Sequence, residues 1–132
     1  MSRILRSIAF IFAASFSSVV ASAHTATPAP TAAEQTFFDF QVDHEARVRV
    51  VRPPVYPEHL RAANVDGQVL VQFVVDERGV AEMNTFKVIK STHTDFTEAV
   101  RRAISSSSYS PAEIRGHPVK QLVQQPFTFT TR

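Results

Sequence analysis

Apolar and polar residues alternate most regularly in the middle of the chain, between Gln68 and Val75. One side of this segment is entirely apolar and the other is half apolar, which is typical of a strand covered on at least one face. The residues on the apolar side are Val69, Val71, Phe73 and Val75. The turn sequence Asp76–Gly79 follows directly, so we expect a β-hairpin.

The return strand of this hairpin, Val80 to Lys90, changes its alternation part of the way along. Met83 falls on one face, whereas Phe86 and Val88 fall on the other. A one-residue β-bulge near Asn84–Thr85 would bring the three side chains to the same face, because an inserted residue reverses the alternation. The sequence therefore predicts a bulge at that position.

Two segments have the spacing of helices. From Asp95 to Ser106, apolar residues recur at helical intervals and form one continuous stripe. The residues of this stripe are Phe96, Ala99, Val100, Ala103 and Ile104. Asp95 together with Glu98 resembles a capping box, which predicts the start of this helix. A shorter helix, Glu58 to Asn64, is predicted after Pro57, because proline is favoured at the first position of a helix.

The last predicted strand follows a loop from Tyr109 to Pro118 and runs from Val119 to about Thr131. Pro126 within it cannot donate to a ladder, so this strand should lie at a sheet edge or bulge there. The order of elements favours an α+β fold, with two helices packed on one face of a three- to four-stranded antiparallel sheet. Two shorter alternating patches, Phe38–Val42 and Arg47–Val50, leave open whether residues 37–51 join the sheet.

The first 23 residues have the order of a secretion signal. Arg3 and Arg6 precede an apolar run from Ile8 to Ala21, and the small residues of Ala21-Ser22-Ala23 predict cleavage before His24. An uncleaved anchor is the alternative, but this run is shorter than the about 20 apolar residues of a spanning helix. We expect 1–23 to be removed, 24–36 to be a flexible tether, and 37–132 to be one domain outside the cytoplasm.

Composition removes several classes of function. The sequence has 14 Lys+Arg against 12 Asp+Glu, so loss of Arg3 and Arg6 leaves 12 of each and a formally neutral chain. No nucleic-acid partner is expected, because such binding depends on a basic face. The absence of cysteine excludes thiol nucleophiles and thiolate metal sites, and three unpaired glycines exclude a phosphate-binding loop.

Histidines and serines are the remaining candidates for chemistry. The histidines are His24, His44, His59, His93 and His117. None forms an HxH or HExxH pair, so we interpret them as solvent-exposed residues and predict no metal site. The serine run Ser105–Ser108 has neither a G-x-S-x-G nor an S-x-x-K motif around it. The sequence therefore predicts a protein that is not an enzyme and that uses no cofactor.

An ordered series of short motifs covers residues 52–129. In chain order they are Tyr56-Pro57, Asp66-Gly67-Gln68-Val69, Asp76-Glu77-Arg78-Gly79-Val80, Ser91-Thr92, Phe96 with Ala99 and Ala103, Tyr109-Ser110-Pro111-Ala112, Gly116-His117-Pro118-Val119 and Pro126-Phe127-Thr128-Phe129. In this order and with these gaps, they resemble the C-terminal domain of the TonB family of energy transducers. The resemblance implies two helices against a three- to four-stranded antiparallel sheet, in agreement with the fold predicted from the residue pattern.

The resemblance also implies a role in the periplasm. Domains of this family pair their C-terminal strand with an extended segment, the TonB box, of an outer-membrane TonB-dependent transporter or receptor, in support of transmembrane transport. Strand addition of this kind uses unpaired N–H and C=O groups at a sheet edge. Carried over to this chain, the partner-binding residues are Val119, Lys120, Gln121, Leu122, Val123, Gln124 and Gln125.

Two alternatives stay open. The same edge strand could pair two copies of the chain, which would make the protein a structural homodimer or larger homo-oligomer of the cell envelope. Retention of the N-terminal segment would instead anchor the protein in the inner membrane, and only in that case do we expect contact with a membrane.

Overall fold

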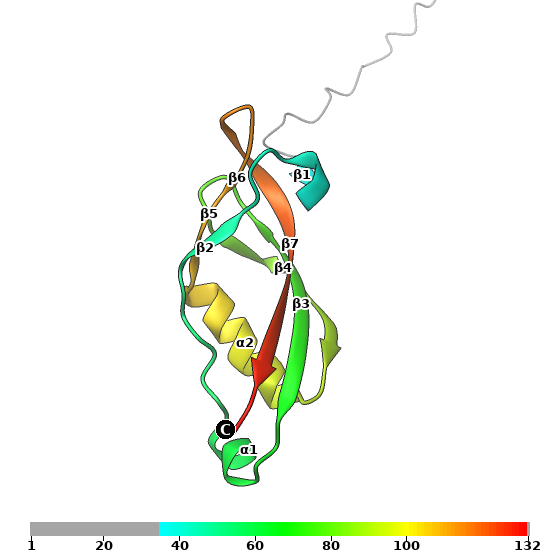
Figure 1. Ribbon diagram of the computed structural model, residues 1–132, viewed down its shortest axis with the longest axis vertical. Coiled ribbons are helices and arrows are strands. Elements are labelled where there is room, and N and C mark those ends of the chain that lie inside the picture. Colours follow the sequence, from blue (N-terminus) through cyan, green and yellow to red (C-terminus); the bar gives the residue numbers. More distant parts are fainter. Residues whose placement is uncertain (1–34, 132) are drawn as a thin grey trace, which may run out of the picture.

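The computed structural model describes residues 35–131, and Figure 1 shows its helices and strands. The predicted signal, 1–23, and the tether as far as residue 34 lie outside the described residues. The elements in chain order are β1 (Thr36–Phe37), the 3₁₀ helix η1 (Asp39–Gln41), β2 (Arg47–Val50), α1 (Glu58–Ala62), β3 (Gly67–Val75), β4 (Ala81–Ser91), α2 (Thr94–Ser106), β5 (Ser108–Ser110), β6 (Ala112–Ile114) and β7 (His117–Phe129). The predicted α+β class is confirmed. Within residues 35–131, no helix has the length and apolarity needed to cross a membrane.

The main sheet has the strand order β1-β7-β3-β4, and β6 pairs with the start of β7. β3 is antiparallel to both neighbours, and its pairing with β7 runs without interruption from Gly67↔Phe129 to Val75↔Gln121. β1 is different, because it pairs with β7 in parallel through Thr36↔Lys120 and Phe37↔Gln121. The prediction of a purely antiparallel sheet was therefore wrong at this edge.

The core lies between α2 and one face of the main sheet, and Figure 1 shows α2 crossing that face, with α1 near the C-terminus. The whole predicted stripe of α2 is buried, and so is the predicted apolar side of β3. The largest fully buried side chains are Phe73, Phe96, Ile104, Val69, Val71, Val75 and Val100. Leu60 brings α1 into the same cluster. Helical and strand periodicity thus identified the two elements that build the core.

α2 begins differently from the predicted capping box. His93 is the N-cap residue, and its Nδ1 accepts a hydrogen bond from the N–H of Asp95 at 3.1 Å. Asp95 lies inside the first turn instead, where a negative charge is favourable near the positive end of the helix dipole. The start predicted at Asp95 was therefore one residue late, because a histidine ring performs the capping that the sequence pattern assigned to a carboxylate.

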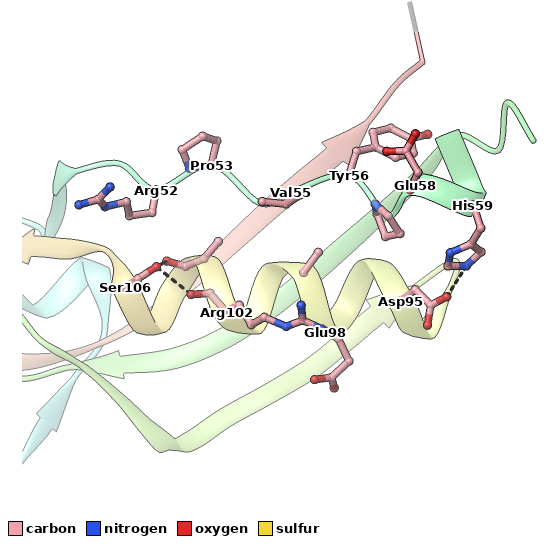
Figure 2. A pocket seen from close by; sticks show the side chains of 13 residues that line it. Arg52, Pro53, Val55, Tyr56, Glu58, His59, Asp95, Glu98, Arg102 and Ser106 are labelled. Atoms are coloured by element: carbon pink, nitrogen blue, oxygen red, sulfur yellow. Dashed lines mark hydrogen bonds and ion pairs between the residues drawn. The ribbon is translucent and has the colours of Figure 1, made fainter. Parts of the chain in front are cut away.

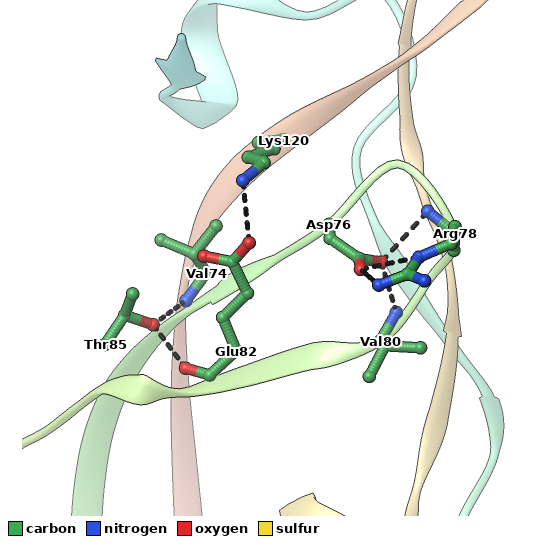
Figure 3. Close-up of polar contacts among 7 residues, drawn as sticks. All are labelled: Val74, Asp76, Arg78, Val80, Glu82, Thr85 and Lys120. Carbon is green, nitrogen blue, oxygen red and sulfur yellow. Dashed lines mark hydrogen bonds and ion pairs between the residues drawn. The ribbon is translucent and has the colours of Figure 1, made fainter. Parts of the chain in front are cut away.

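β4 contains the predicted irregularity, but it is larger than one residue. Gln72 pairs with Lys87 and Val74 pairs with Glu82, so Met83–Phe86 stand opposite Phe73 alone, and a second register shift follows at Ile89. Thr85 stabilises the larger bulge, because its Oγ1 accepts from the N–H of Val74 at 2.8 Å and donates to the C=O of Glu82 at 2.6 Å (Figure 3). Its position was predicted correctly and its size was not.

The N-terminal part of the described chain divides between two sheets. β1 joins the main sheet, whereas β2 pairs with β5 in a separate two-stranded sheet. The predicted loop 109–118 holds the end of β5 and all of β6. The alternation at Phe38–Val42 did not produce a strand, because η1 occupies most of it. Phe38 and Phe40 are both exposed, and their rings stack on each other with centroids 5.6 Å apart.

The hairpin turn between β3 and β4 depends on Asp76. Its Oδ1 accepts from the N–H groups of Arg78 and Val80, each at 2.9 Å, and its Oδ2 pairs with the Arg78 guanidinium at 2.9 Å (Figure 3). Burial alone raises the pKa of Asp76, but the hydrogen bonds from Val80 and Arg78 together outweigh burial. They hold the pKa of this carboxyl below its ordinary value of 3.8.

Acid is therefore expected to destabilise the domain through Asp76. A group whose folded pKa is lowered stabilises the fold fully above its unfolded pKa, here 3.8, and this contribution is lost as the pH falls through the folded pKa. Asp76→Asn should be less stable than the natural protein at neutral pH but should lose less stability on acidification. Urea unfolding at a series of pH values from about 7 to about 2 measures this difference. Parallel stability curves for the two proteins would contradict the prediction.

Candidate functional site

β7 has one edge that pairs first with β6, through Val119↔Ala112, and then with β3, from Gln121 to Phe129. On its second, outer edge, Lys120 and Gln121 pair with β1. From Leu122 to Phe129, β3 is the only strand that pairs with β7 in residues 35–131. Of the seven predicted partner-binding residues, the stretch from Leu122 to Gln125 therefore has an open edge, whereas the first three residues meet other strands of the same chain.

Pro126 identifies the backbone groups that point out of this open edge. It pairs with Leu70 of β3 and has no N–H, so its nitrogen belongs on the side away from β3. The N–H and C=O of one residue point to the same side of a strand, and the side alternates from residue to residue. Leu122 and Gln124 therefore each direct an N–H and a C=O outward, and Pro126 directs only a C=O outward. Lys120 has the same parity, and its outward side faces β1. The parallel register Phe37↔Gln121 also directs the N–H of Leu122 to Phe37.

The side chains of β7 alternate between the core and the other face of the sheet. Val123 and Phe127 pack against the core cluster. Lys120 points to the other face, where its Nζ lies 2.7 Å from Oε1 of Glu82 on β4 (Figure 3). The hydrogen bond to Glu82 is the main cause that raises the pKa of Lys120 above its ordinary value. Lys120 is therefore a half-buried partner in an ion pair between strands.

Gln121 fastens the N-terminal segment to β7. It is buried, and its Oε1 accepts from the N–H of Ala46 at 2.6 Å. A second attachment follows at Asp43, whose Oδ2 accepts from the N–H of Arg115 at 2.6 Å and whose N–H donates to the C=O of Glu113. Residues 43–46 are thus held against β6 and β7 independently of β1. Sequence reasoning missed this arrangement, since none of these contacts is local in the chain.

Gln125 has an unused acceptor beside the open edge. Its Oε1 is buried and has no hydrogen-bond partner among the described residues. The side chain lines a cavity of about 100 Å³ that is also bordered by Val48, Val51 and Pro53. A buried carbonyl without a donor is unusual in a folded protein. The unpaired acceptor of Gln125 is therefore enclosed within the domain and does not add to the open edge.

A larger groove of about 680 Å³ lies between α2 and the extended connection that leads to α1 (Figure 2). At one end, His59 Nε2 lies 2.6 Å from Oδ2 of Asp95. Ser106 lies at the other end, and its Oγ donates to the C=O of Arg102. Asp95 and Ser106 are 11 residues apart on α2, which separates them by about 16 Å along the axis. The groove therefore does not assemble a Ser-His-Asp triad.

The structure places two of the histidines near each other, His59 in α1 and His93 at the N-cap of α2. The rings of His59 and His93 have centroids 6.4 Å apart, and both are near Asp95. No group of three or more potential ligands suited to a metal ion occurs in the part of the chain that the structure describes. His24 lies outside that part.

Comparison with known proteins is consistent with this geometry. A family model described as the Gram-negative bacterial TonB protein C-terminal region matches residues 52–131. A solved structure, the solution NMR structure of the Pseudomonas aeruginosa TonB C-terminal domain, is similar with a TM-score of 0.57 and 26% sequence identity over 67% of this chain and 88% of that chain. No curated protein matches the chain significantly. The family match covers more than half of the sequence, so the chain belongs to the family of TonB C-terminal domains.

Proposed function

We propose that this protein is a periplasmic, non-catalytic binding module that captures an extended segment of an outer-membrane TonB-dependent transporter by strand addition. The segment, of the TonB-box type, would pair with the outer edge of β7. The observation that carries this proposal is the open edge from Leu122 to Gln125, next to a family match that links the domain to transport. By binding this segment, the module is expected to support transport, and it is not expected to catalyse a reaction.

Backbone pairing gives a physical reason for binding at this edge. Gln124 offers an outward donor, and Leu122 and Gln124 offer two outward acceptors, and an extended chain satisfies them by forming one more ladder. Pro126 ends the run of donors, so we expect the guest ladder to be short. Backbone bonds would supply the affinity for the guest segment.

The N-terminal segment completes the proposed role. Cleavage of 1–23 would release the protein into the periplasm, with 24–36 as a tether ahead of the domain. An intact N-terminus would instead anchor it in the inner membrane. The mass of the exported protein decides between these two cases.

Gln124→Pro tests the proposed site with little disturbance of the fold. The substitution removes one outward N–H, and because Gln124 has the same parity as Pro126, no bond to β3 is lost. Binding of synthetic peptides that carry the TonB boxes of transporters from the same cell should weaken by up to about tenfold, because one lost hydrogen bond is worth about 0.5–1.5 kcal/mol. Isothermal titration calorimetry measures the affinity, and NMR shift changes along Val119–Gln125 locate the site.

Thr128→Pro is the matched control. It also removes an outward N–H from β7, but on the far side of Pro126, so peptide affinity should stay unchanged. Peptides that bind both variants equally well, or that shift no resonances between Val119 and Gln125, would contradict the proposed site.

The alternative, a homo-oligomer paired through the same edge, gives a different result. Light scattering would then show a dimer without any peptide, and Gln124→Pro would dissociate it. A monomer that binds peptide excludes that alternative.

A further inference from the structure

We propose that β1 is a displaceable strand that occupies part of the partner-binding edge and competes with the incoming segment. The inference rests on the proposed function and adds a regulatory element to it. β1 already makes the kind of contact that strand addition requires, because Thr36 and Phe37 pair with Lys120 and Gln121 at the outer edge of β7. The chain thus contains its own occupant for the first positions of that edge.

The length of the remaining edge gives the reason for competition. With β1 in place, the free outward donor before Pro126 is that of Gln124, because the parallel register Phe37↔Gln121 directs the N–H of Leu122 to the C=O of Phe37. Lys120 has the same parity, and its outward side is taken by β1. A strand in a protein is usually about five or six residues long. An incoming segment therefore gains a longer ladder by displacing β1 than by ending at Leu122.

β1 is also the weakest part of the sheet. It has only two residues, Thr36 is exposed and Phe37 is half-buried. The next aromatic residues do not secure it, because Phe38 and Phe40 are exposed and stack on each other. Few buried contacts and a short ladder are the properties of a segment that opens locally while the rest of the domain stays folded.

Contacts made by the residues that follow β1 limit the part of the chain that can leave the edge to the residues before Asp43. Ala46 is bound to the side chain of Gln121, and Asp43 is bound to Arg115 and Glu113. These contacts do not involve β1. Residues 36–42 can therefore leave the edge as a flap that remains tethered at Asp43, and β1 can return when the guest dissociates.

A reversible covalent lock tests the competition. Thr36→Cys combined with Lys120→Cys places two cysteines on directly paired residues, in neighbouring strands about 4.8 Å apart, within the range of a disulfide. The natural chain has no cysteine, so a single bridge forms. The same molecule, reduced, is the control, because both forms lack the Lys120–Glu82 ion pair. The oxidised form should bind the transporter peptides at least about tenfold more weakly than the reduced form.

Release of β1 should have the opposite effect. Phe37→Pro removes the N–H that Phe37 brings to the ladder, and we expect peptide affinity to rise by up to about tenfold, because the open edge becomes the main population. Phe40→Ser removes an exposed aromatic side chain outside the ladder and should leave affinity unchanged.

The outcomes of these experiments distinguish the competition by β1 from the binding function itself. Equal affinity of the oxidised and reduced forms, or tighter binding by the oxidised form, overturns the competition by β1 and leaves the binding function standing. No binding to the reduced form, to Phe37→Pro or to the natural protein contradicts the binding function itself. Weaker binding of the oxidised form together with tighter binding of Phe37→Pro supports both.

Discussion

Replacement of Phe96 by alanine is expected to lower the free energy of unfolding by about 3–5 kcal/mol, the usual cost of deleting a buried aromatic ring. Phe96 is completely buried and connects three elements. Its ring stacks on Phe129 at the end of β7 with centroids 4.3 Å apart, and it meets Tyr56, before α1, edge to face at 5.4 Å. The cavity left by alanine would open between α2, α1 and the strand that carries the proposed binding edge.

Urea unfolding monitored by circular dichroism measures this loss. Domains of this size are stable by only about 5–15 kcal/mol, so the variant should be close to its unfolding transition under mild conditions. Phe96→Leu keeps most of the buried apolar surface and should lose less stability. Phe40→Ala is the surface control, because its ring is 81% exposed and its loss should change stability little. Similar losses for Phe96→Ala and Phe40→Ala would show that the stacked cluster does not hold the elements together.

The core was the part of the fold that sequence pattern predicted best. The stripe of α2 and the alternation of β3 are local periodicities, and burial of one face produces each of them. Phe96 and Phe73 could therefore be assigned to the interior without knowledge of their neighbours, and both are fully buried.

β1 and the size of the β4 bulge could not be predicted in the same way. Two residues that pair in parallel with a strand more than 80 positions away leave no periodic pattern. At β4, the number of bulged residues depends on the Thr85 hydroxyl replacing a ladder bond to Val74, and the sequence shows only that the alternation changes.

The candidate site has one feature that the sequence pattern predicted and others that depend on distant parts of the chain. β7 was predicted as the last strand, and Pro126 correctly indicated an edge on that part of it. Occupancy of an edge depends on which distant segments reach it, so the pairing of β1 at Lys120 and Gln121 was not foreseeable. The ion pair of Lys120 with Glu82 is equally nonlocal, since it joins strands on either side of β3.

Gly79→Ala should destabilise the domain by about 2–5 kcal/mol, through two effects that add. Gly79 has φ +80°, a conformation that costs other residues about 1–2 kcal/mol. A Cβ at this position would also collide with the carbonyl oxygen of Tyr109, whose N–H donates to the C=O of Gly79 at 2.9 Å. Backbone cannot rotate aside as a side chain does, so overpacking adds about 1–3 kcal/mol. The contact docks the β3–β4 turn on β5, which leads through β6 into β7.

Gly116→Ala separates the two effects. Gly116 has φ +76°, close to that of Gly79, but a Cβ there would meet nothing within 4 Å. It should therefore lose only the conformational term of about 1–2 kcal/mol. Urea unfolding of both variants measures the difference, which we attribute to the collision with Tyr109. Equal losses in the two variants would mean that the turn moves away from β5 at no cost, and that this contact does not hold the hairpin against the segment leading into β7.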